Sequence, residues 1–485
     1  MRRIVEQAAG AARAAGFAAT IAVTDAEANV LGVFRMDGAE AAARVSGDPG
    51  GGLQGALLPS DRVAIAKAAT GALLSSGGNA FSTRTASFIV QPHFPPGVDF
   101  TPGGPLFGVQ FSSLACGDFK RPGSPLGLSG DPGGLPLYRE GSLIGGIGVE
   151  GDFVYGVDAD PADLDAPPEE SVALAGAAGL EAPDLIRAGQ ILADGIRLAY
   201  TNATAAPAAS GAVPGTWLVL PRAAQPSALV AATAAGTSGR ADPRYSVRGG
   251  AILTAADVAT LLDQAARQTS ATRSAIRQPL GSSARVSIAV VDVNGGVLGF
   301  FQNDDAPNFG IDVSVQKARS AAFFSGPGAG DALRRAGLAA YVPADLPLDG
   351  QFAYTSRAVG FLAQPLFPPG IPRSAPGPFS VPLEAWSPFN TGLQLDLINL
   401  AGVGSCSAVP GLPNGITIFP GGIPVWKDGR LAGAIGVSGD GVDQDDLIAA
   451  AGSAGFEIPS ERRSDRVEIR GVRLPWVKLP RHPEL

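Results

Sequence analysis

The residues best suited to bind a ligand lie in the first half of the chain: Arg35, Met36, Asp37, Lys67 and His93. Guanidinium and ammonium groups bind carboxylates, so Arg35 and Lys67 are candidates to hold an acidic ligand. Met36 and His93 carry sulfur and nitrogen atoms of the kind that ligate iron. A structural interpretation stays open, in which Arg35 pairs with Asp37 at a strand end, Lys67 extends along its helix and His93 is an ordinary loop residue.

The composition excludes several classes of protein. Two His, two Cys and two Met among 485 residues are too few for a zinc site, and we expect no resident metal ion of that kind. The second histidine, His482, lies in the C-terminal tail. The net charge of −8, without a basic stripe, argues against a nucleic-acid partner. No apolar run reaches the length of about 18 residues that a membrane span needs.

The two cysteines, Cys116 and Cys406, each follow a short apolar run at corresponding places in the two halves. They are candidates for a disulfide in an oxidising compartment, and two buried free thiols are the alternative. No His and Asp partner set accompanies either of them, so we do not expect a cysteine nucleophile.

The chain contains an internal repeat. Two pairs of segments are each identical at 10 of 19 positions, namely 21–39 with 288–306 and 134–152 with 422–440. Between them, QPHFPPG at 91–97 matches QPLFPPG at 364–370 at 6 of 7 positions. Because the three matches occur in the same order with unequal spacings, they indicate a duplicated domain rather than an array of short repeats.

Each half has the same predicted order of elements: helix, hairpin, helix, hairpin, helix. The hairpins predict antiparallel sheets that helices cover on at least one face, which is the α+β class. In the first half the helices are predicted over Gln7–Ala15, Ser60–Ser75 and Glu169–Gly179, and the strands over Thr20–Thr24, Val30–Arg35, Leu135–Tyr138 and Leu143–Val149. In the second half the helices are predicted over Ala255–Thr269, Asp312–Phe324 and Asp445–Gly455, and the strands over Ser287–Val291, Val297–Gln302, Ile423–Trp426 and Leu431–Val437.

The repeat also predicts the domain boundaries. The first domain spans 1–200 with a Pro-rich insert at about 92–133, and the second spans 251–485 with a Pro-rich insert at about 365–421. Residues 201–250 are rich in Ala, Gly and Pro and have no counterpart inside a repeat, so they are predicted to be a connector. Within this connector, the run Trp217-Leu218-Val219-Leu220 is apolar enough to dock on a domain.

Two further motifs have structural interpretations. The acidic stretches Asp158–Asp165 and Asp440–Asp446 could bind calcium, but neither has the spacing of a calcium loop. Paired acids begin the last helix of each half, at Glu169-Glu170 and Asp445-Asp446, where they stabilise the helix N-terminus without a metal. Residues 146–151 read G-x-G-x-x-G, but no helix follows them directly. We therefore expect a glycine-rich strand packed closely against a helix rather than a dinucleotide site.

The first repeat begins about half a helix late when it is compared with the second, where Thr254 is suited to cap the corresponding helix. A missed upstream start codon, with or without a signal peptide, would explain this difference. The expected location is periplasmic or secreted if the N-terminus is truncated, and cytoplasmic otherwise.

Three motifs together are typical of one family. They are IAVTDAEANVLGVFRMDGA at 21–39, Ala66-Lys67-Ala68 in the following helix, and GIPVWKDGRLAGAIGVSGDGVDQDDLIAAAG at 422–452. On these motifs the chain resembles the GlcG/HbpS family, also called haem-degrading or PduO C-terminal-like domains. The resemblance covers nearly all of both repeats apart from the Pro-rich inserts. It implies two tandem profilin-like domains, each an antiparallel sheet flanked by helices.

The resemblance implies a haem- or tetrapyrrole-binding protein that assists haem degradation or iron handling, with haem as its cofactor. The chemistry of the residues makes Arg35 and Lys67 candidates to hold the propionates and Met36 or His93 candidates to approach the iron, whereas the resemblance itself assigns no iron ligand to a position of this chain. The second repeat keeps Lys317 but has Gln302 and Asn303 in place of Arg35 and Met36. The ligand is therefore expected in the first half.

Two alternatives to haem binding stay open. One is a non-catalytic structural or interaction protein that uses the Pro-rich inserts as its partner surface. The other is an enzyme that acts on a small organic acid, held by Arg35 and Lys67. In each case the two repeats are expected to form a pseudo-dimer within the chain, and a further homo-oligomer stays open.

Overall fold

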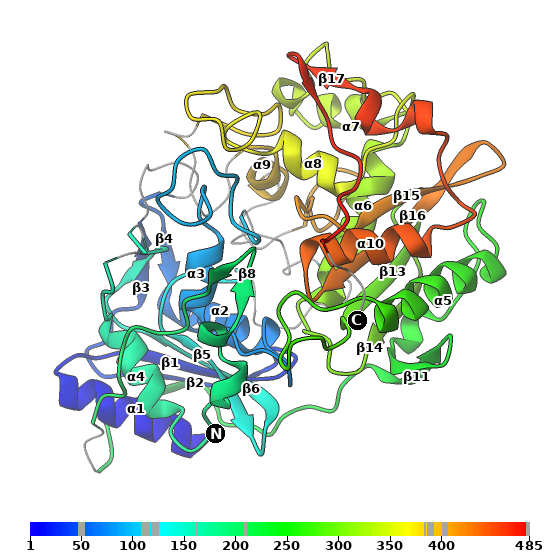
Figure 1. Cartoon of the computed structure of the whole chain (residues 1–485). Helices are drawn as coiled ribbons and strands as arrows, with labels where there is room; N and C mark the ends of the chain where they lie inside the picture. Colours follow the sequence, from blue (N-terminus) through cyan, green and yellow to red (C-terminus); the bar gives the residue numbers. More distant parts are fainter. Residues whose placement is uncertain are drawn as a thin grey trace. The chain divides into compact units, whose positions relative to one another are not determined.

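The computed structural model describes residues 1–46, 54–107, 117, 126–158, 160–161, 163–207, 211–382, 385, 392–399 and 406–481 (Figure 1). These residues form two compact units, the first built mainly from residues 1–226 and the second mainly from residues 227–485. Both units combine α-helices with antiparallel sheets, which confirms the predicted α+β class.

The first unit is built on a five-stranded sheet with the strand order β10-β2-β1-β6-β5. Its strands are β1 (Thr20–Asp25), β2 (Val30–Met36), β5 (Gly134–Arg139), β6 (Ser142–Glu150) and β10 (Gly215–Val219), and all neighbours are antiparallel. Thr20, the first residue of the central strand β1, lies opposite Arg35 of β2 and Glu150 of β6. One end of the sheet therefore carries a cationic and an anionic side chain on either side of the same residue.

Helices cover both faces of this sheet. The helices concerned are α1 (Arg2–Ala15), α2 (Ser60–Leu73) and α4 (Pro168–Gly176). Ala22 of β1 packs against Ala64 and Ala68 of α2, whereas its neighbour Ile21 belongs to the core that contains Val172 of α4 and much of α1. Adjacent residues of a strand point to opposite faces, so α2 lies on one face and α1 with α4 on the other. Figure 1 shows α1 and α4 side by side.

Shorter elements complete the first unit. They are β3 (Ala42–Val45), β4 (Leu57–Pro59), α3 (Thr83–Ile89), β7 (Val154–Tyr155), β8 (Leu192–Ala193), β9 (Ile196–Arg197) and the 3-10 turns Asp184–Ile186 and Ala188–Gln190. Ser82 caps α3 in a capping box with Thr85, because each side chain accepts a hydrogen bond from the other residue's backbone N–H. The loop that contains His93 follows directly after α3.

The second unit has a six-stranded sheet with the strand order β11-β12-β14-β13-β16-β15. Its strands are β11 (Val230–Ala234), β12 (Thr237–Ala241), β13 (Val286–Asp292), β14 (Val297–Asn303), β15 (Gly422–Lys427) and β16 (Arg430–Gly439). Its main helices are α5 (Ala255–Ala271), α6 (Gly310–Phe324) and α10 (Val442–Gly452). Ala289 of β13 packs with α6, while the adjacent Ile288 packs with α5 and α10, so helices cover both faces here as well.

Further short elements lie mostly outside this second sheet. They are α7 (Ala329–Arg335), α8 (Ser356–Leu362), α9 (Leu393–Asn399), β17 (Glu468–Ile469), β18 (Val472–Arg473) and the 3-10 turns Pro243–Tyr245, Ala339–Tyr341, Ser460–Arg462 and Ser464–Arg466. Much of a separate apolar cluster, with Phe324, Tyr354 and Phe379 at its centre, comes from α7, α8 and α9. These helices enlarge the second unit beyond the helix and hairpin order predicted from the repeat.

In each unit, the second of the two predicted hairpins has the tight turn that its sequence predicts. Glu140 and Gly141 join β5 to β6 with φ values of 51° and 78°, and Asp428 and Gly429 join β15 to β16 with φ values of 52° and 74°. Two consecutive residues with positive φ make the turn whose twist matches that of the flanking strands.

The region predicted to be a connector contributes strands to both sheets. β10 pairs with β2, and β12 pairs with β14 while β11 pairs with β12. Residues 201–250 therefore form edge strands as well as a connection, and the apolar residues Trp217-Leu218-Val219 lie in β10, against the first sheet. Within the described residues, no helix combines the length and the apolar character needed to cross a bilayer.

Candidate functional site

Lys67 lies at the centre of a buried group of charges, the Lys67 cluster, which consists of Lys67, Asp131, Glu150 and Glu169. Its ammonium is 3.0 Å from Oδ2 of Asp131, 2.9 Å from Oε2 of Glu150 and 3.2 Å from Oε1 of Glu169. None of the four side chains is more than 6% exposed. Because a buried charge is costly unless it is paired, the ammonium is what allows these acids to lie inside the unit.

Glycines of the sheet allow α2 to deliver Lys67 to this position. A Cβ atom on Gly148 would lie 2.1 Å from the carbonyl oxygen of Ala64, and one on Gly134 would lie 2.4 Å from that of Lys67. The helix backbone can therefore approach β5 and β6 closely only because these positions carry no side chain. From there the Lys67 side chain reaches Glu150, the last residue of β6.

Glu169 is fixed in the first turn of α4. Its Oε1 atom accepts hydrogen bonds from the backbone N–H groups of Gly151 at 2.8 Å and Asp152 at 3.3 Å. The N-terminus of a helix also favours a negative charge. Glu169 is therefore stabilised as a carboxylate by more than its ion pair with Lys67.

The pKa values of the Lys67 cluster depart from their ordinary ranges. Burial raises the pKa of Asp131 well above its ordinary value and that of Glu150 to about 7, and Lys67 offsets this only in part. Burial also raises the pKa of Glu169. Burial alone would lower the pKa of Lys67, but the three acids outweigh it and the pKa lies well above the ordinary value. The cluster thus combines a charged ammonium with acids that bind protons more tightly than exposed carboxylates do.

The second unit has a simpler buried lysine. The ammonium of Lys317 in α6 is 2.8 Å from Oδ2 of Asp445 and donates a hydrogen bond of 2.9 Å to the carbonyl oxygen of Val437. Burial lowers the pKa of Lys317 and raises the pKa of Asp445 to about 6. In the aligned segments 134–152 and 422–440, the position of Glu150 is taken by Ser438. Only one carboxylate lies within ion-pair distance of Lys317 among the described residues.

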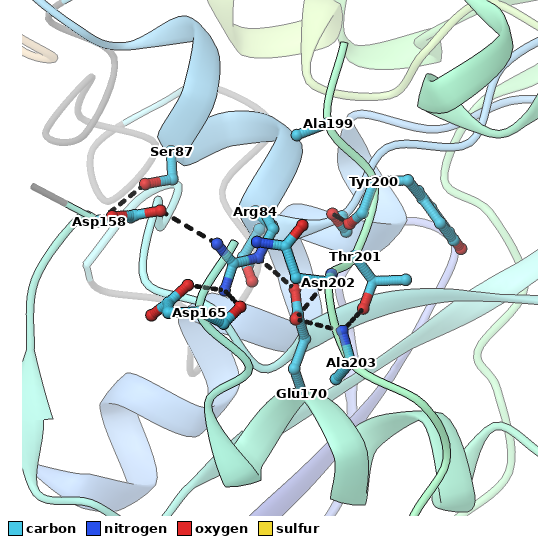
Figure 2. A network of polar contacts seen from close by, with 12 residues as sticks. Arg84, Ser87, Asp158, Asp165, Glu170, Ala199, Tyr200, Thr201, Asn202 and Ala203 are labelled. Atoms are coloured by element: carbon cyan, nitrogen blue, oxygen red, sulfur yellow. Dashed lines mark hydrogen bonds and ion pairs between the residues drawn. The ribbon is translucent and has the colours of Figure 1, made fainter. Parts of the chain in front are cut away.

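A second buried cation, Arg84, connects α3 to α4 and to an acidic loop. Its guanidinium lies 2.8 Å from Glu170, 3.0 Å from Asp158 and 2.8 Å from Asp165. Figure 2 shows the Arg84 side chain between these three acids. The adjacent glutamates at the start of α4 therefore bind cations from two different helices, Glu169 from α2 and Glu170 from α3.

The same network holds the segment that follows β9. Oε2 of Glu170 accepts hydrogen bonds from the backbone N–H groups of Asn202 at 3.1 Å and Ala203 at 3.3 Å (Figure 2). Oγ1 of Thr85 donates a hydrogen bond of 2.7 Å to the carbonyl oxygen of Ala199. In the second unit, Arg357 forms the corresponding contacts with Asp443 and Asp446. The Arg84 network is thus an architectural element with a counterpart in the other unit.

Two groups of acidic oxygens in the described residues are close enough to hold a metal ion. They are Glu150, Asp152 and Glu169, and Asp158, Asp163 and Asp165. In the first group two acids already bind the ammonium of Lys67, and in the second two bind the guanidinium of Arg84. A side-chain cation thus already occupies each group, and we assign a metal to neither.

The neighbouring candidates Arg35, Met36 and Asp37, at the end of β2, lie in different surroundings. Arg35 is 24% exposed and lies 3.9 Å from Asp61 of α2, rather than pairing with Asp37. Met36 is buried in the core with α1, and its sulfur accepts the backbone N–H of Ala19 at 3.4 Å. Asp37 is exposed. Arg35 therefore faces the α2 side of the sheet while Met36 faces the opposite side.

Lys67 and His93 are placed differently from the residues of β2. None of the hydrogen bonds or ion pairs described for the five candidates joins one of them to another. Lys67 is fully buried in its own cluster. His93 is half-buried in the loop after α3, and its Nδ1 atom lies 2.8 Å from the carbonyl oxygen of Thr101.

The predicted disulfide lies only partly within the described residues. Cys406 is disulfide-bonded, whereas Cys116 lies outside the described residues. Their pairing stays a prediction. His482 also lies outside the described residues.

Residues 399–454 match the model of a family described as haem degrading protein HbpS-like. This segment of the chain is HbpS-like. The resemblance to the GlcG/HbpS family, predicted from the sequence motifs, is confirmed here. The HbpS-like segment contains β15, β16 and α10, and so it includes Asp445, the partner of Lys317. A comparison with curated proteins gives no match.

Three solved structures are similar to parts of the chain. A PduOC:heme complex is 21% identical, with coverage of 37% of this chain and 90% of that chain and a TM-score of 0.24. The Klebsiella pneumoniae protein ORFY is 19% identical, with coverage of 41% and 88% and a TM-score of 0.24. A double mutant of Streptomyces reticuli HbpS is 20% identical, with coverage of 36% and 73% and a TM-score of 0.18. At TM-scores this low the likeness carries no argument about the site.

Sequence reasoning did not find the acids of the Lys67 cluster. Glu169 was expected only to stabilise a helix N-terminus, and Asp131 and Glu150 were not singled out. One signal was present, because Glu150 ends a glycine-rich apolar strand that had to be buried. A carboxylate at such a position requires a buried cation nearby.

Proposed function

We propose that the chain binds haem or a related tetrapyrrole through its first unit. One support for haem binding by the chain is the HbpS-like segment of the second unit, whose family is described as haem degrading. The stronger support is the geometry of His93 in the loop after α3.

The hydrogen bond of His93 prepares one ring nitrogen for a metal. A carbonyl oxygen can only accept a hydrogen bond, so Nδ1 of His93 carries the proton that it donates to Thr101 at 2.8 Å. In the neutral ring, Nε2 is then the unprotonated nitrogen, with a lone pair available to an iron atom. Histidine ligands of metals are commonly held in this way, because a hydrogen bond from the other nitrogen fixes the tautomer and the ring orientation.

The same loop exposes apolar side chains that suit a flat aromatic ligand. Val98 is 46% exposed and Phe100 is 74% exposed. Phe100 also has a φ of 61°, a backbone conformation that is uncommon for a bulky residue. Strained residues persist where the surrounding structure or a function maintains them. His93 would hold the iron, and Val98 and Phe100 would cover part of the ring.

Arg35 is the better of the two predicted carboxylate binders. Its only described ion pair is long, at 3.9 Å, and its Nε atom has no hydrogen-bond partner among the described residues. Lys67, in contrast, already faces three carboxylates inside the unit. We therefore propose that Arg35, and not Lys67, receives a propionate.

The test is a titration of the purified chain with haemin, followed by the Soret band and by thermal stability. The chain has only two histidines, so His93→Ala and His482→Ala form a decisive pair. We expect the wild type and His482→Ala to give a histidine-ligated spectrum, and His93→Ala to lose it together with at least about tenfold in affinity. Absence of a Soret shift in the wild type, or a wild-type spectrum in His93→Ala, would refute the proposal.

We also propose that the two units arose by internal duplication and form a pseudo-dimer of tandem profilin-like domains. The support is that the strand orders β2-β1-β6-β5 and β14-β13-β16-β15 follow the same order of matching sequence segments. The pairs Lys67–Glu169 and Lys317–Asp445 also occupy corresponding elements. An experimental structure in which these strands do not superpose would contradict the duplication.

A further inference from the structure

The Lys67 cluster contains more acids than it can neutralise. One ammonium faces the carboxyl groups of Asp131, Glu150 and Glu169, all within 3.2 Å, and a fourth acid, Asp152, follows two residues after Glu150. The four members are almost completely removed from water. Three carboxylates and one ammonium would leave two uncompensated negative charges in the interior, an arrangement that desolvation makes very costly.

The hydrogen bonds show which charges are compensated. Glu169 accepts two backbone N–H groups besides Lys67 and lies at a helix N-terminus, so its negative charge is supported from several sides. Glu150 has no such backbone support: among the described residues, the ammonium of Lys67 at 2.9 Å is the only donor close to its carboxyl group, and its side chain is 0% exposed. Oδ2 of Asp131 likewise has only its ion contact with Lys67. Lys67 can balance one of these last two acids but not both.

We propose that Asp131 and Glu150 together form a proton-binding site that holds one proton in the folded chain at neutral pH. The proton neutralises one acid of the pair, Lys67 balances the other, and Glu169 relies on its backbone donors. No bond other than an O–H bond forms or breaks. The site makes no use of the loop of His93, so this inference is independent of haem binding.

Four charged side chains surround Glu150. Asp131 before β5, Asp152 after β6 and Glu169 from α4 favour proton uptake, whereas Lys67 from α2 opposes it. The nearby Tyr155 of β7 is uncharged, because burial raises its pKa. Burial is the largest influence on the pKa of Glu150 and raises it to about 7, with Lys67 opposing and Glu169 and Asp152 adding to the rise. Since Asp131 and Glu150 interact strongly, their protons belong to the pair rather than to one residue.

The second unit shows that the fold does not need this site. Lys317 is balanced by one acid, Asp445, and Ser438 stands at the position of Glu150. Among the described residues, an excess of acids around the buried lysine is thus found in the first unit and not in the second. These acids make the stability of the first unit fall as pH rises. Between the ordinary pKa of an exposed glutamate and about pH 7, the folded pair binds a proton that the unfolded chain does not bind.

The first experiment measures the protons released when the full chain is unfolded by guanidinium at about pH 6 in weakly buffered solution with an indicator dye. We expect Glu150→Gln and Asp131→Asn each to release about one proton fewer than the wild type. The exposed substitution Glu6→Gln serves as the matched control and should release the same number as the wild type. Equal release from wild type and both cluster variants would overturn the proposal.

A second measurement needs only the wild type and so stays decisive if a variant fails to fold. Infrared spectra in deuterated buffer should show the carbonyl stretch of a protonated, buried carboxylic acid near neutral pD. The band should weaken and disappear as the pD is raised into the alkaline range, because the pair then loses its proton. A folded wild-type chain without this band at neutral pD would overturn the proposal.

Discussion

Removing the ammonium of the Lys67 cluster should expose how much the first unit depends on it. In Lys67→Met the side chain keeps much of its length, but Asp131, Glu150 and Glu169 lose their shared cation. Breaking a buried ion pair in this way costs about 3–5 kcal/mol. For a domain of this size, 1 kcal/mol corresponds to about 2–4 °C in the melting temperature, so we expect a loss of roughly 6–20 °C.

The loss should also depend on pH in a defined direction. Without Lys67 the pKa values of all three acids rise further, so the folded variant must bind more protons than the unfolded chain. Its stability should recover as pH falls toward about 5 and worsen as pH rises toward about 8. The stabilisation that each protonated acid contributes is complete below the pKa that the acid has in the unfolded chain, and it is lost above the pKa that the acid has in the folded chain.

Differential scanning calorimetry across this pH range is the assay, and Lys317→Met is the matched control. The control leaves a single acid, Asp445, which one proton can neutralise. We therefore expect its melting temperature to depend on pH less steeply than that of Lys67→Met. Our reasoning about the cluster would be refuted if the two variants showed the same pH dependence, or if Lys67→Met melted like the wild type.

Three further predictions concern other parts of the chain. Arg84→Ala leaves Glu170 buried without its cation, and the backbone N–H groups of residues 202–203 donate hydrogen bonds to Glu170. These amide hydrogens should therefore exchange faster with solvent, as measured by mass spectrometry. Unchanged exchange would contradict the role of Arg84. Gly148→Ala places a Cβ atom 2.1 Å from a carbonyl oxygen of α2. The free energy of unfolding, measured with denaturant, should fall by about 1–3 kcal/mol. An unchanged free energy of unfolding would show that α2 can shift. Thr254→Ala removes the cap of α5, whose capping box includes Asp257, and should cost about 1 kcal/mol, with Thr254→Ser as the conservative control that keeps it.

Local patterns predicted most of the two main sheets. The strand predicted over Leu135–Tyr138 is found at Gly134–Arg139, and its hairpin partner predicted over Leu143–Val149 is found at Ser142–Glu150. Alternating apolar residues and a Glu-Gly turn are enough to specify such a hairpin. The residues of β10 were recognised as apolar enough to dock on a domain, but not as a strand, because β10 pairs with β2, more than a hundred residues away in the chain.

The chemistry of the site could be predicted only in part. Lys67 was identified as a candidate from its residue type, but its partner Glu169 is 102 positions away in the chain. A sequence can suggest which residue is charged, whereas the identity of its counter-ion depends on how α2 and α4 pack at one end of the sheet. Arg35 was placed on the correct strand, and its separation from Met36 follows from the alternation of strand side chains.

The adjacent glutamates at the start of α4 have a consequence for how the first unit opens. Glu169 pairs with Lys67 of α2, and Glu170 pairs with Arg84 of α3. If α4 detached, it would therefore remove a counter-ion from a buried cation on each of these two helices. The three helices should therefore unfold as a single cooperative block rather than fray one by one. Since the loop of His93 begins where α3 ends, a ligand bound to this loop would stabilise the whole block of three helices. Release of the ligand would then lower the stability of residues as distant as Glu150 at the end of β6.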